Sequence, residues 1–399
     1  MSRPTQPGHS VVAAPLSSQP LCELIAHEIR ATGGWIPFDR FMHLALYAPG
    51  LGYYSGGRRV IGHLPQDGSD FVTAPELTPL FGEVLARQLE EALAATQTDQ
   101  IWEFGAGSGA LACALLDALG EQLSRYTIVE VSGALRDRQH ARILREHPGL
   151  AHKVVWADAL PDRFEGVLVG NEVLDAMPVS LLHWDGQAWL QRGVSLADAA
   201  PPTSGDAHRF AWADQPSDTP GTRPDTERDD AEFIAGTVVE THSQAEAFIT
   251  TLAAGLQRGA AFFIDYGFPE AEYYHPQRTG GTLMCHHAHT SDADPLVGIG
   301  EKDITAHVNF TGIALAGQNA GWEVLGYTSQ GRFLANCGLG EAMARVSTQQ
   351  TVQALRDQVA MNRLIADHEM GELFKVIGFV KGPWFEAKGF QSGDRTHTL

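Results

Sequence analysis

The 399-residue sequence has few cysteines, few basic residues and no long hydrophobic run, and each absence excludes a class of protein. No apolar run approaches the ~18 residues that span a bilayer, which argues against membrane insertion. The first 20 residues lack the basic end and apolar stretch of a secretory signal. We therefore expect a cytoplasmic protein. The cysteines are widely separated and form no CxxC pair, so we expect free thiols and no bound metal. They are Cys22, Cys113, Cys285 and Cys337.

The shortage of basic residues indicates which kinds of partner the protein can bind. There are 28 Lys and Arg against 48 Asp and Glu, a net charge of −20. A surface of this sign repels phosphate backbones and anionic lipids, so we expect no nucleic-acid partner. The same charge is compatible with a basic protein partner. The composition, 44% hydrophobic and 19% charged, is that of a globular protein able to bury a substantial core.

The pattern along the chain predicts a core with additions before it, within it and after it. We expect a disordered tail (1–18), then a helical and loop segment (19–98). The core follows in two parts (99–180 and 239–385). They are separated by an accessory insertion with a flexible acidic, Pro-rich stretch (181–238). A flexible tail (386–399) ends the chain.

From residue 100 short apolar runs alternate with helical patterns. Strands are expected at 101–104, 126–130, 154–156, 167–169 and 260–265, and helices at 110–119, 133–146 and 246–256. Buried strands joined through helices form a parallel sheet covered on both faces. The sequence therefore predicts an α/β protein with a mainly parallel, doubly wound sheet of Rossmann-like type.

A glycine-rich loop lies directly after the first of these strands and before a helix. It reads Glu103-x-Gly105-x-Gly107-x-Gly109, with Ala106 between the first two glycines. Without Cβ atoms the backbone can turn sharply and lie against a ligand. A dinucleotide fingerprint is spaced G-x-G-x-x-G, and an acid at the strand end would oppose its pyrophosphate. The spacing and Glu103 favour the ammonium-bearing methyl donor S-adenosylmethionine. We expect the segment 19–98 to form a lid over this cofactor.

Two further acids follow neighbouring strands. Glu130 ends the next strand, 27 residues after Glu103, where a carboxylate can accept both ribose hydroxyls. Asp158 follows the strand at 154–156 and is placed to accept from the adenine amino group. The alternative is that these acids only cap helices or face solvent. That alternative is weaker for Glu103 and Glu130, which accompany the glycines, than for Asp158 alone.

Taken together, these motifs resemble the MidA family of class I methyltransferases from about residue 21 to residue 378. The resemblance implies a methyltransferase that uses S-adenosylmethionine, with Thr73, Pro75 and Asn171 also at the cofactor. The mitochondrial member of that family dimethylates an arginine on a subunit of respiratory complex I. A protein arginine, with a respiratory-complex subunit as one candidate, is thus the implied acceptor, and a homodimer the implied assembly. Two positions depart from the family pattern, Ser69 and Asn309. The matching segments are Tyr47–Tyr54, Asp70–Glu76, Phe81–Gly82, Glu103–Gly109, Ile128–Glu130, Gly170–Pro178, Ile264–Gly267, Gly281–Leu283 and Asp303–Phe310.

A guanidinium acceptor needs carboxylates that hold its planar fork. Glu172 and Asp175 follow the strand at 167–169, and ligands of such sheets bind beyond the carboxyl ends of the strands. We expect Glu172 to face the guanidinium, with Asp175 second and Glu76 third. Asp175 could instead be a helix cap, and Glu76 could supply first-turn charge to its helix. Asp265 or Tyr266, at another strand end, could line the same pocket.

Histidines cluster at His286, His287 and His289. No carboxylate or thiolate spacing accompanies them, so a metal site is disfavoured. We expect His289 in the substrate pocket as a proton acceptor. The leading function is transfer of a methyl group to a protein arginine. Two alternatives stay open: another acceptor, either a small molecule or a different protein residue, and a non-catalytic assembly factor that binds S-adenosylmethionine.

Overall fold

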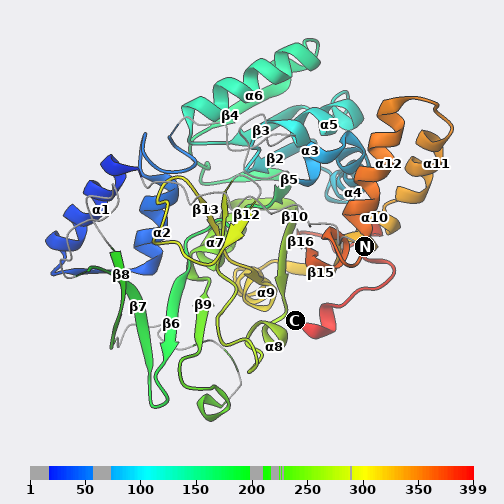
Figure 1. The fold of residues 1–399 in the computed structure, drawn as a ribbon. Coiled ribbons are helices and arrows are strands. Elements are labelled where there is room, and N and C mark those ends of the chain that lie inside the picture. Colours follow the sequence, from blue (N-terminus) through cyan, green and yellow to red (C-terminus); the bar gives the residue numbers. More distant parts are fainter. Residues whose placement is uncertain are drawn as a thin grey trace, which may run out of the picture.

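The computed structural model describes residues 18–56, 73–197, 210–216, 224, 226, 229–287 and 290–399. A central eight-stranded sheet carries the order β15-β16-β10-β5-β2-β3-β4, with β14 paired to β10 (Figure 1). Only β16 runs antiparallel to its neighbours; the other pairs are parallel. The strands are β2 (Gln100–Phe104), β3 (Arg125–Val129), β4 (Val154–Ala157), β5 (Phe164–Asn171), β10 (Leu256–Phe268), β14 (Val308–Asn309), β15 (Glu323–Ser329) and β16 (Phe374–Lys381).

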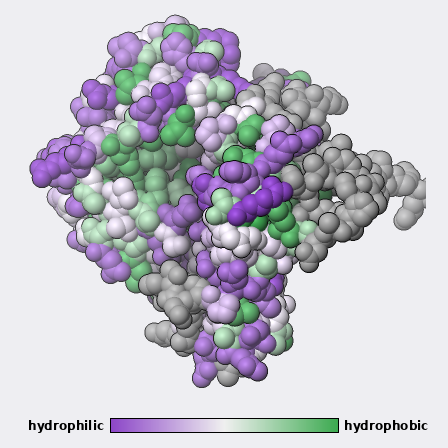
Figure 2. Space-filling model, turned by 90° about the vertical axis from the view of Figure 1, so that its left-hand side faces the viewer, coloured by the Kyte–Doolittle hydropathy of each residue, from purple (hydrophilic) through white to green (hydrophobic). Residues whose placement is uncertain are grey.

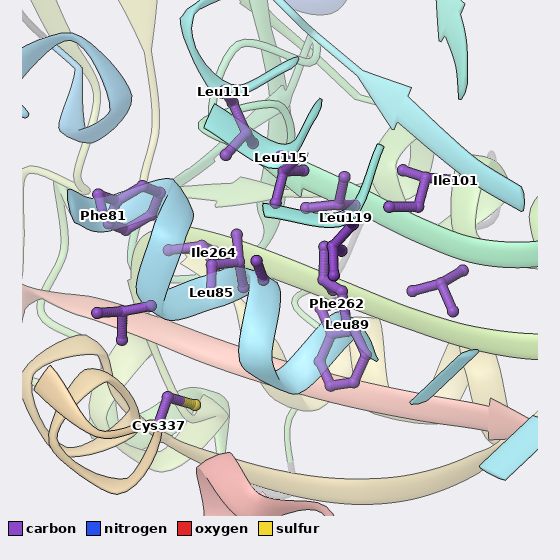
Figure 3. Close-up of a cluster of buried hydrophobic side chains, with 14 of the residues drawn as sticks. Phe81, Leu85, Leu89, Ile101, Leu111, Leu115, Leu119, Phe262, Ile264 and Cys337 are labelled. Atoms are coloured by element: carbon purple, nitrogen blue, oxygen red, sulfur yellow. The ribbon is translucent and has the colours of Figure 1, made fainter. Parts of the chain in front are cut away.

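Helices cover both faces of this sheet. On one face α4 (Pro79–Thr96) packs Phe81, Leu85 and Leu89 against α5 (Ala110–Leu119) and β10 (Figure 3). On the other face α7 (Ser243–Gly255) and α9 (Phe310–Asn319) form a second cluster with the sheet. The predicted α/β, doubly wound, mainly parallel fold is confirmed.

Further helices pack around the sheet, most of them beside α4 and α5 (Figure 1). α6 follows β3, and α10 to α12 pack beside α4. Short 3₁₀ turns occur at Ala151–Lys153 and Asp230–Glu232. The bounds are α3 (Ala74–Leu77), α6 (Gly133–Glu146), α8 (Glu270–Tyr273), α10 (Gln330–Asn336), α11 (Leu339–Ser347), α12 (Val352–Ile365) and α13 (Met370–Leu373). Within the described ranges no helix is both long and apolar enough to cross a bilayer.

A second, antiparallel sheet is built from two distant parts of the chain. Its order is β1-β7-β6-β9, and β8 pairs with β7. Its strands are β1 (Trp35–Pro37), β6 (Ser180–Trp184), β7 (Trp189–Leu196), β8 (Phe210–Gln215) and β9 (Val238–Thr241). The N-terminal helices α1 (Gln19–Ala31) and α2 (Phe38–Tyr47) bury Ile25, Phe38 and Phe41 in the same cluster as residues of this sheet. The N-terminal segment and the insertion therefore share one core.

A small three-stranded sheet, β12 (Thr290–Asp292), β11 (Met284–His287) and β13 (Asp303–Thr305), packs against α2 through that cluster. The molecular face in Figure 2 is hollowed, and hydrophobic residues stand on the walls of the hollow.

The C-terminal segment differs from the flexible tail expected for residues 386–399. It forms 3₁₀ turns at Lys388–Phe390 and Thr396–Thr398. Phe390 is buried, and Gly326 and Gly378 leave room for its ring, because a Cβ on either would lie within 2.6 Å of it. Polar residues dominate this segment, and its one buried ring has no periodicity around it. The sequence pattern therefore does not show the packing.

Candidate active site

A cavity of about 880 Å³ lies at the carboxyl ends of β2, β3 and β5. Ligand sites of enzymes typically range from roughly 300 to 1,000 Å³. One wall is the glycine loop and the end of β3, and a second is the loop 171–176. The remaining walls come from α2, α3, α13 and the three-stranded sheet. The cavity thus gathers segments from the N-terminal helices, the core and the small sheet.

The glycine loop owes its shape to positive φ angles. Gly105, Gly107 and Gly109 have φ of 67°, 52° and 82°, a region that residues with a Cβ rarely adopt. A Cβ on Gly105 would also lie 2.2 Å from Cγ2 of Val173. All of the loop from Gly105 to Ser108 faces the cavity, including buried Ala106, and Gly109 is the N-cap of α5. The loop is a cradle whose backbone angles favour glycine at these three positions, and at Gly105 a side chain would also clash with Val173.

Glu103 lies at the end of β2, almost completely buried, and lines the cavity. The Tyr126 hydroxyl donates a 2.8 Å hydrogen bond to its carboxylate. Burial raises the pKa of Glu103 to about 7. A cationic group in the cavity would stabilise the charged carboxylate, which is the chemistry predicted for this acid.

Glu130 lines the cavity at the end of β3 and is held by its neighbours. The Ser132 amide donates to one carboxylate oxygen at 2.8 Å, and the Gln139 amide donates to the other at 3.3 Å. Gln139 is fully buried and also donates to the Gly107 carbonyl at 3.0 Å. It therefore ties Glu130 to the glycine loop. Sequence reasoning missed Gln139 because it lies in mid-helix with no motif around it.

Asp158 is placed differently from its predicted contact with an adenine. Its side chain is 85% exposed, 4.0 Å from Arg136, and it does not line the cavity. The cause is the position of β4 at the edge of the sheet, where the chain turns toward solvent after Ala157. Val131, Ser132 and Leu135 form the cavity wall after β3 instead.

Thr73, Pro75 and Glu76 line the cavity beside the glycine loop. Glu76 accepts hydrogen bonds from Ser108 and from the Arg142 guanidinium at 3.1 Å. Its carboxylate is therefore already paired with a guanidinium of the protein. This arrangement connects α3, the glycine loop and α6, and it makes Glu76 a poorer candidate than Glu172 for an acceptor.

The loop after β5 presents the two leading acids. Asn171 donates to Glu172 Oε1 at 2.9 Å, and the Ala74 amide donates to the same oxygen at 3.4 Å. Glu172 has a φ of 52°, unusual for a residue with a Cβ; such strain is often found at functional sites. Burial and the neighbouring Asp175 raise the pKa of Glu172 to about 8. One buried oxygen of Asn171 has no hydrogen-bond partner among the described residues.

Asp265 fixes this loop from behind. One of its carboxylate oxygens accepts from the amides of Val173, Leu174 and Asp175 at 3.1, 2.9 and 3.3 Å. Asp265 is fully buried and does not line the cavity. Asp175 does line it, and one of its oxygens is buried without a partner in the part of the chain described. Burial raises the pKa of Asp175, and Tyr266, also in the cavity wall, hydrogen-bonds to it.

Aromatic rings and a further acid also line the cavity. The Tyr54 hydroxyl lies 2.9 Å from both carboxylate oxygens of Asp303. The Tyr47 ring stacks on that of Tyr54 at 5.5 Å, and its hydroxyl donates to the Ala176 carbonyl at 2.9 Å. Sequence reasoning did not single out Asp303, although it lies in one of the family-like segments.

Two of the histidines considered from the sequence fall on different sides of the small sheet. His286 lines the cavity, whereas His287 Nδ1 lies 2.8 Å from the Glu301 carbonyl. His289 lies outside the described residues. His307 also lines the cavity, and burial lowers its pKa to about 4. Among the residues with described positions, one group could hold a metal, and it contains none of these histidines: Cys113, Glu146 and His147.

The fold and this cavity define a class I methyltransferase that uses S-adenosylmethionine. The family model for S-adenosyl-L-methionine-dependent methyltransferases matches residues 84–328, and the chain belongs to that family. Among curated proteins it is 27% identical to the mitochondrial protein arginine methyltransferase NDUFAF7 homolog of Caenorhabditis elegans, over 90% of this chain and 84% of that protein. It is 26% identical to human mitochondrial NDUFAF7, over 94% and 87%.

A solved structure is closer in sequence. A superfamily member from Burkholderia thailandensis, bound to S-adenosyl-homocysteine, is 49% identical with a TM-score of 0.87. The match covers 95% of this chain and 96% of that one. These findings confirm the predicted cofactor and the predicted class of enzyme. The curated relatives are named as mitochondrial proteins, so by this finding the cytoplasmic prediction is wrong.

Proposed function

We propose that the enzyme transfers the methyl group of S-adenosylmethionine to an arginine side chain of a protein. The observation that carries this proposal is the pair of acids in the cavity wall, part-buried Glu172 and buried Asp175, on a loop that also contacts the glycine cradle. A planar guanidinium is held best by carboxylates that accept from its fork of N–H groups. The curated relatives are named protein arginine methyltransferases, which supports the same acceptor.

The residues of the cradle fit the cofactor, which supplies an electrophilic methyl group when bound. We assign the backbone of Gly105, Ala106, Gly107 and Gly109 to close contact with it, because the three glycines hold positive φ angles and a Cβ on Gly105 would clash with Val173. Glu103 is assigned to its ammonium and Glu130 to its ribose, since carboxylates accept from both groups. Thr73, Pro75 and Asn171, which also line the cavity, are assigned to the cofactor as well.

The acids also suit the proton chemistry of the acceptor. When its nitrogen gains a methyl carbon it must lose a proton, and Glu172 is the base we assign to it. A carboxylate with a pKa near 8 is mostly protonated in the free enzyme at neutral pH. A cationic acceptor favours its charged form, so acceptor binding releases a proton. Tyr47 and Tyr54 offer ring faces on which a guanidinium can stack.

The test is methyl transfer from labelled S-adenosylmethionine in a lysate of cells that lack the protein, followed by mass spectrometry of the labelled product. We expect label on arginine of one or a few proteins. Glu172→Gln should lower the rate by about 10²–10⁴-fold with cofactor affinity kept. The wild-type rate with subsaturating acceptor should rise with pH through about 8, because the charged form of Glu172 binds the cation.

The matched control is Glu165→Gln, which changes a partly exposed acid of β5, the strand that precedes Glu172; Glu165 is ion-paired with Arg258. It should leave transfer unchanged. Label found only in small molecules, or full activity in Glu172→Gln, would contradict the proposal.

Resemblance to the MidA family adds two narrower proposals. A subunit of a respiratory complex is the candidate acceptor, and a homodimer is the candidate assembly. Mass spectrometry of the labelled protein tests the first, and sedimentation of the purified enzyme tests the second.

A further inference from the structure

Helix α12 has an apolar surface that nothing in the described structure covers. Val352, Leu355 and Val359 are 70%, 63% and 56% exposed, and they share one face at helical spacing. The opposite face is buried, and the Thr78 hydroxyl donates to Asp357 there at 2.9 Å. The orientation of α12 is therefore fixed with its apolar row outward, an arrangement typical of a binding surface.

This row leads to the mouth of the cavity. Arg363 lies one helical turn after Val359 on the same face and lines the cavity. Met370 and Leu373 of the adjacent α13 also line it, and Leu373 is 48% exposed. The row and the rim thus form one surface, the α12 row, that runs from solvent to the acids.

The α12 row is too small for a stable dimer. From Val352 to Arg363 it is about 16 Å long, at 1.5 Å per residue. Three partly exposed side chains over that length offer at most a few hundred Å², whereas stable interfaces bury roughly 800 Å² per partner. The size fits a segment of about five extended residues.

We propose that the α12 row binds the polypeptide flank of the methyl acceptor. The substrate then carries apolar residues beside its arginine, and these residues pack on Val352, Leu355 and Val359 while the guanidinium reaches Glu172. This inference rests on the proposed function for the reacting group, and it adds that recognition extends outside the cavity. It therefore predicts a polypeptide acceptor in place of free arginine.

The experiment uses synthetic peptides of about 16 residues, each with a single arginine. One set has three leucines before or after the arginine, and its partner set has serines there. With wild-type enzyme the better leucine peptide should have a KM about tenfold below that of its serine partner, with similar kcat. The double variant Leu355→Gln/Val359→Gln should remove this difference, and transfer to N-acetyl-arginine amide should not change.

Leu315→Gln is the matched control, because Leu315 is 45% exposed on α9, which packs on the other face of the sheet. It should keep the tenfold difference. Peptide binding is also measured by fluorescence anisotropy with S-adenosylhomocysteine present. Binding lost in the α12 variant but no transfer in any enzyme would support the α12 row and refute arginine as the acceptor. An unchanged leucine preference in the α12 variant, or a wild-type dimer that this variant converts to monomers, would overturn the inference.

Discussion

Gly105→Ala adds a single methyl group to the cofactor loop and so tests whether the loop needs glycine at this position. The new Cβ would lie 2.2 Å from Cγ2 of Val173. Real carbon atoms do not approach so closely, so either the glycine loop or the loop of Val173 must shift. Val173 follows Glu172 directly, and a shift there would also move the acid that we assign to the acceptor.

The size of the effect follows from two separate costs. Alanine at a φ of 67° costs about 1–2 kcal/mol. Inserting a methyl group into a packed contact costs about 1–3 kcal/mol more. We therefore expect Gly105→Ala to lower the free energy of unfolding by about 2–5 kcal/mol. A typical domain has about 5–15 kcal/mol, so the variant should still fold.

Val173→Ala separates these two costs. It removes the methyl group that the new Cβ meets but leaves the φ unchanged. In a double-mutant cycle the pair should be about 1–3 kcal/mol more stable than the sum of the single changes predicts. The measurements are urea denaturation and calorimetric titration with S-adenosylhomocysteine. Gly149→Ala is the control, because its Cβ would meet nothing within 4 Å and its φ is ordinary.

Two results would refute this reasoning. If Gly105→Ala were as stable as wild type and bound the cofactor equally well, the loop would not need glycine. If the double-mutant cycle showed no coupling, the contact with Val173 would not be the cause.

Three further predictions follow from the same geometry. Glu130→Gln should weaken S-adenosylhomocysteine binding by about 10-fold or more, since a neutral amide accepts more weakly than a carboxylate; calorimetry measures this, and an unchanged Kd would exclude the ribose contact. Burial raises the folded pKa of Glu103 from 4.5 to about 7, so its contribution to stability is complete below about pH 4.5 and is lost as pH rises through about 7. Urea denaturation measures the free energy of unfolding at pH 5 and pH 8. Between these pH values it should fall less for Glu103→Gln than for wild type, and an equal fall in both proteins would contradict this. Asp265→Asn keeps the shape but weakens three hydrogen bonds to the loop of Glu172, so kcat should fall by about 10-fold or more while the cofactor Kd stays constant; a fall in affinity alone would point elsewhere.

Local patterns were enough to predict the cofactor loop and five strands of the central sheet, β2, β3, β4, β5 and β10, but not β14, β15 and β16. Each of the five predicted strands contains a short apolar run bounded by turn residues, so its position shows in the sequence. Gly105, Glu103 and Glu130 could be assigned because their positions at strand ends are local too. The same holds for Glu172, which directly follows the last residue of β5.

The supporting contacts could not be predicted in this way. Asp265 lies 91 residues from Leu174, whose amide it binds, and no local pattern records such a pairing. Gln139 reaches Gly107 across 32 residues by the packing of α6. Asp158 is the reverse case, in which the local pattern is correct but the position in the sheet is not visible. It follows a strand as expected, but that strand is at the sheet edge and the side chain is exposed. Acids at the ends of the inner strands β2, β3 and β5 line the cavity, whereas the acid after the edge strand β4 does not.

The acids of the cavity, and not the net charge of the chain, explain why the site suits cationic ligands. Burial works against a charged carboxylate, and the pKa values of Glu103 and Glu172, about 7 and about 8, record that cost. Neither acid belongs to the hydrophobic clusters that pack on the two faces of the sheet. Glu103 lies at the end of β2 directly before the glycine loop, and Glu172 follows β5 near Asp175 and Asp303. A cationic cofactor and a cationic acceptor would repel each other in one cavity. In the function proposed above, two acids that become charged as these cations bind offset that repulsion, and each positions one reactant.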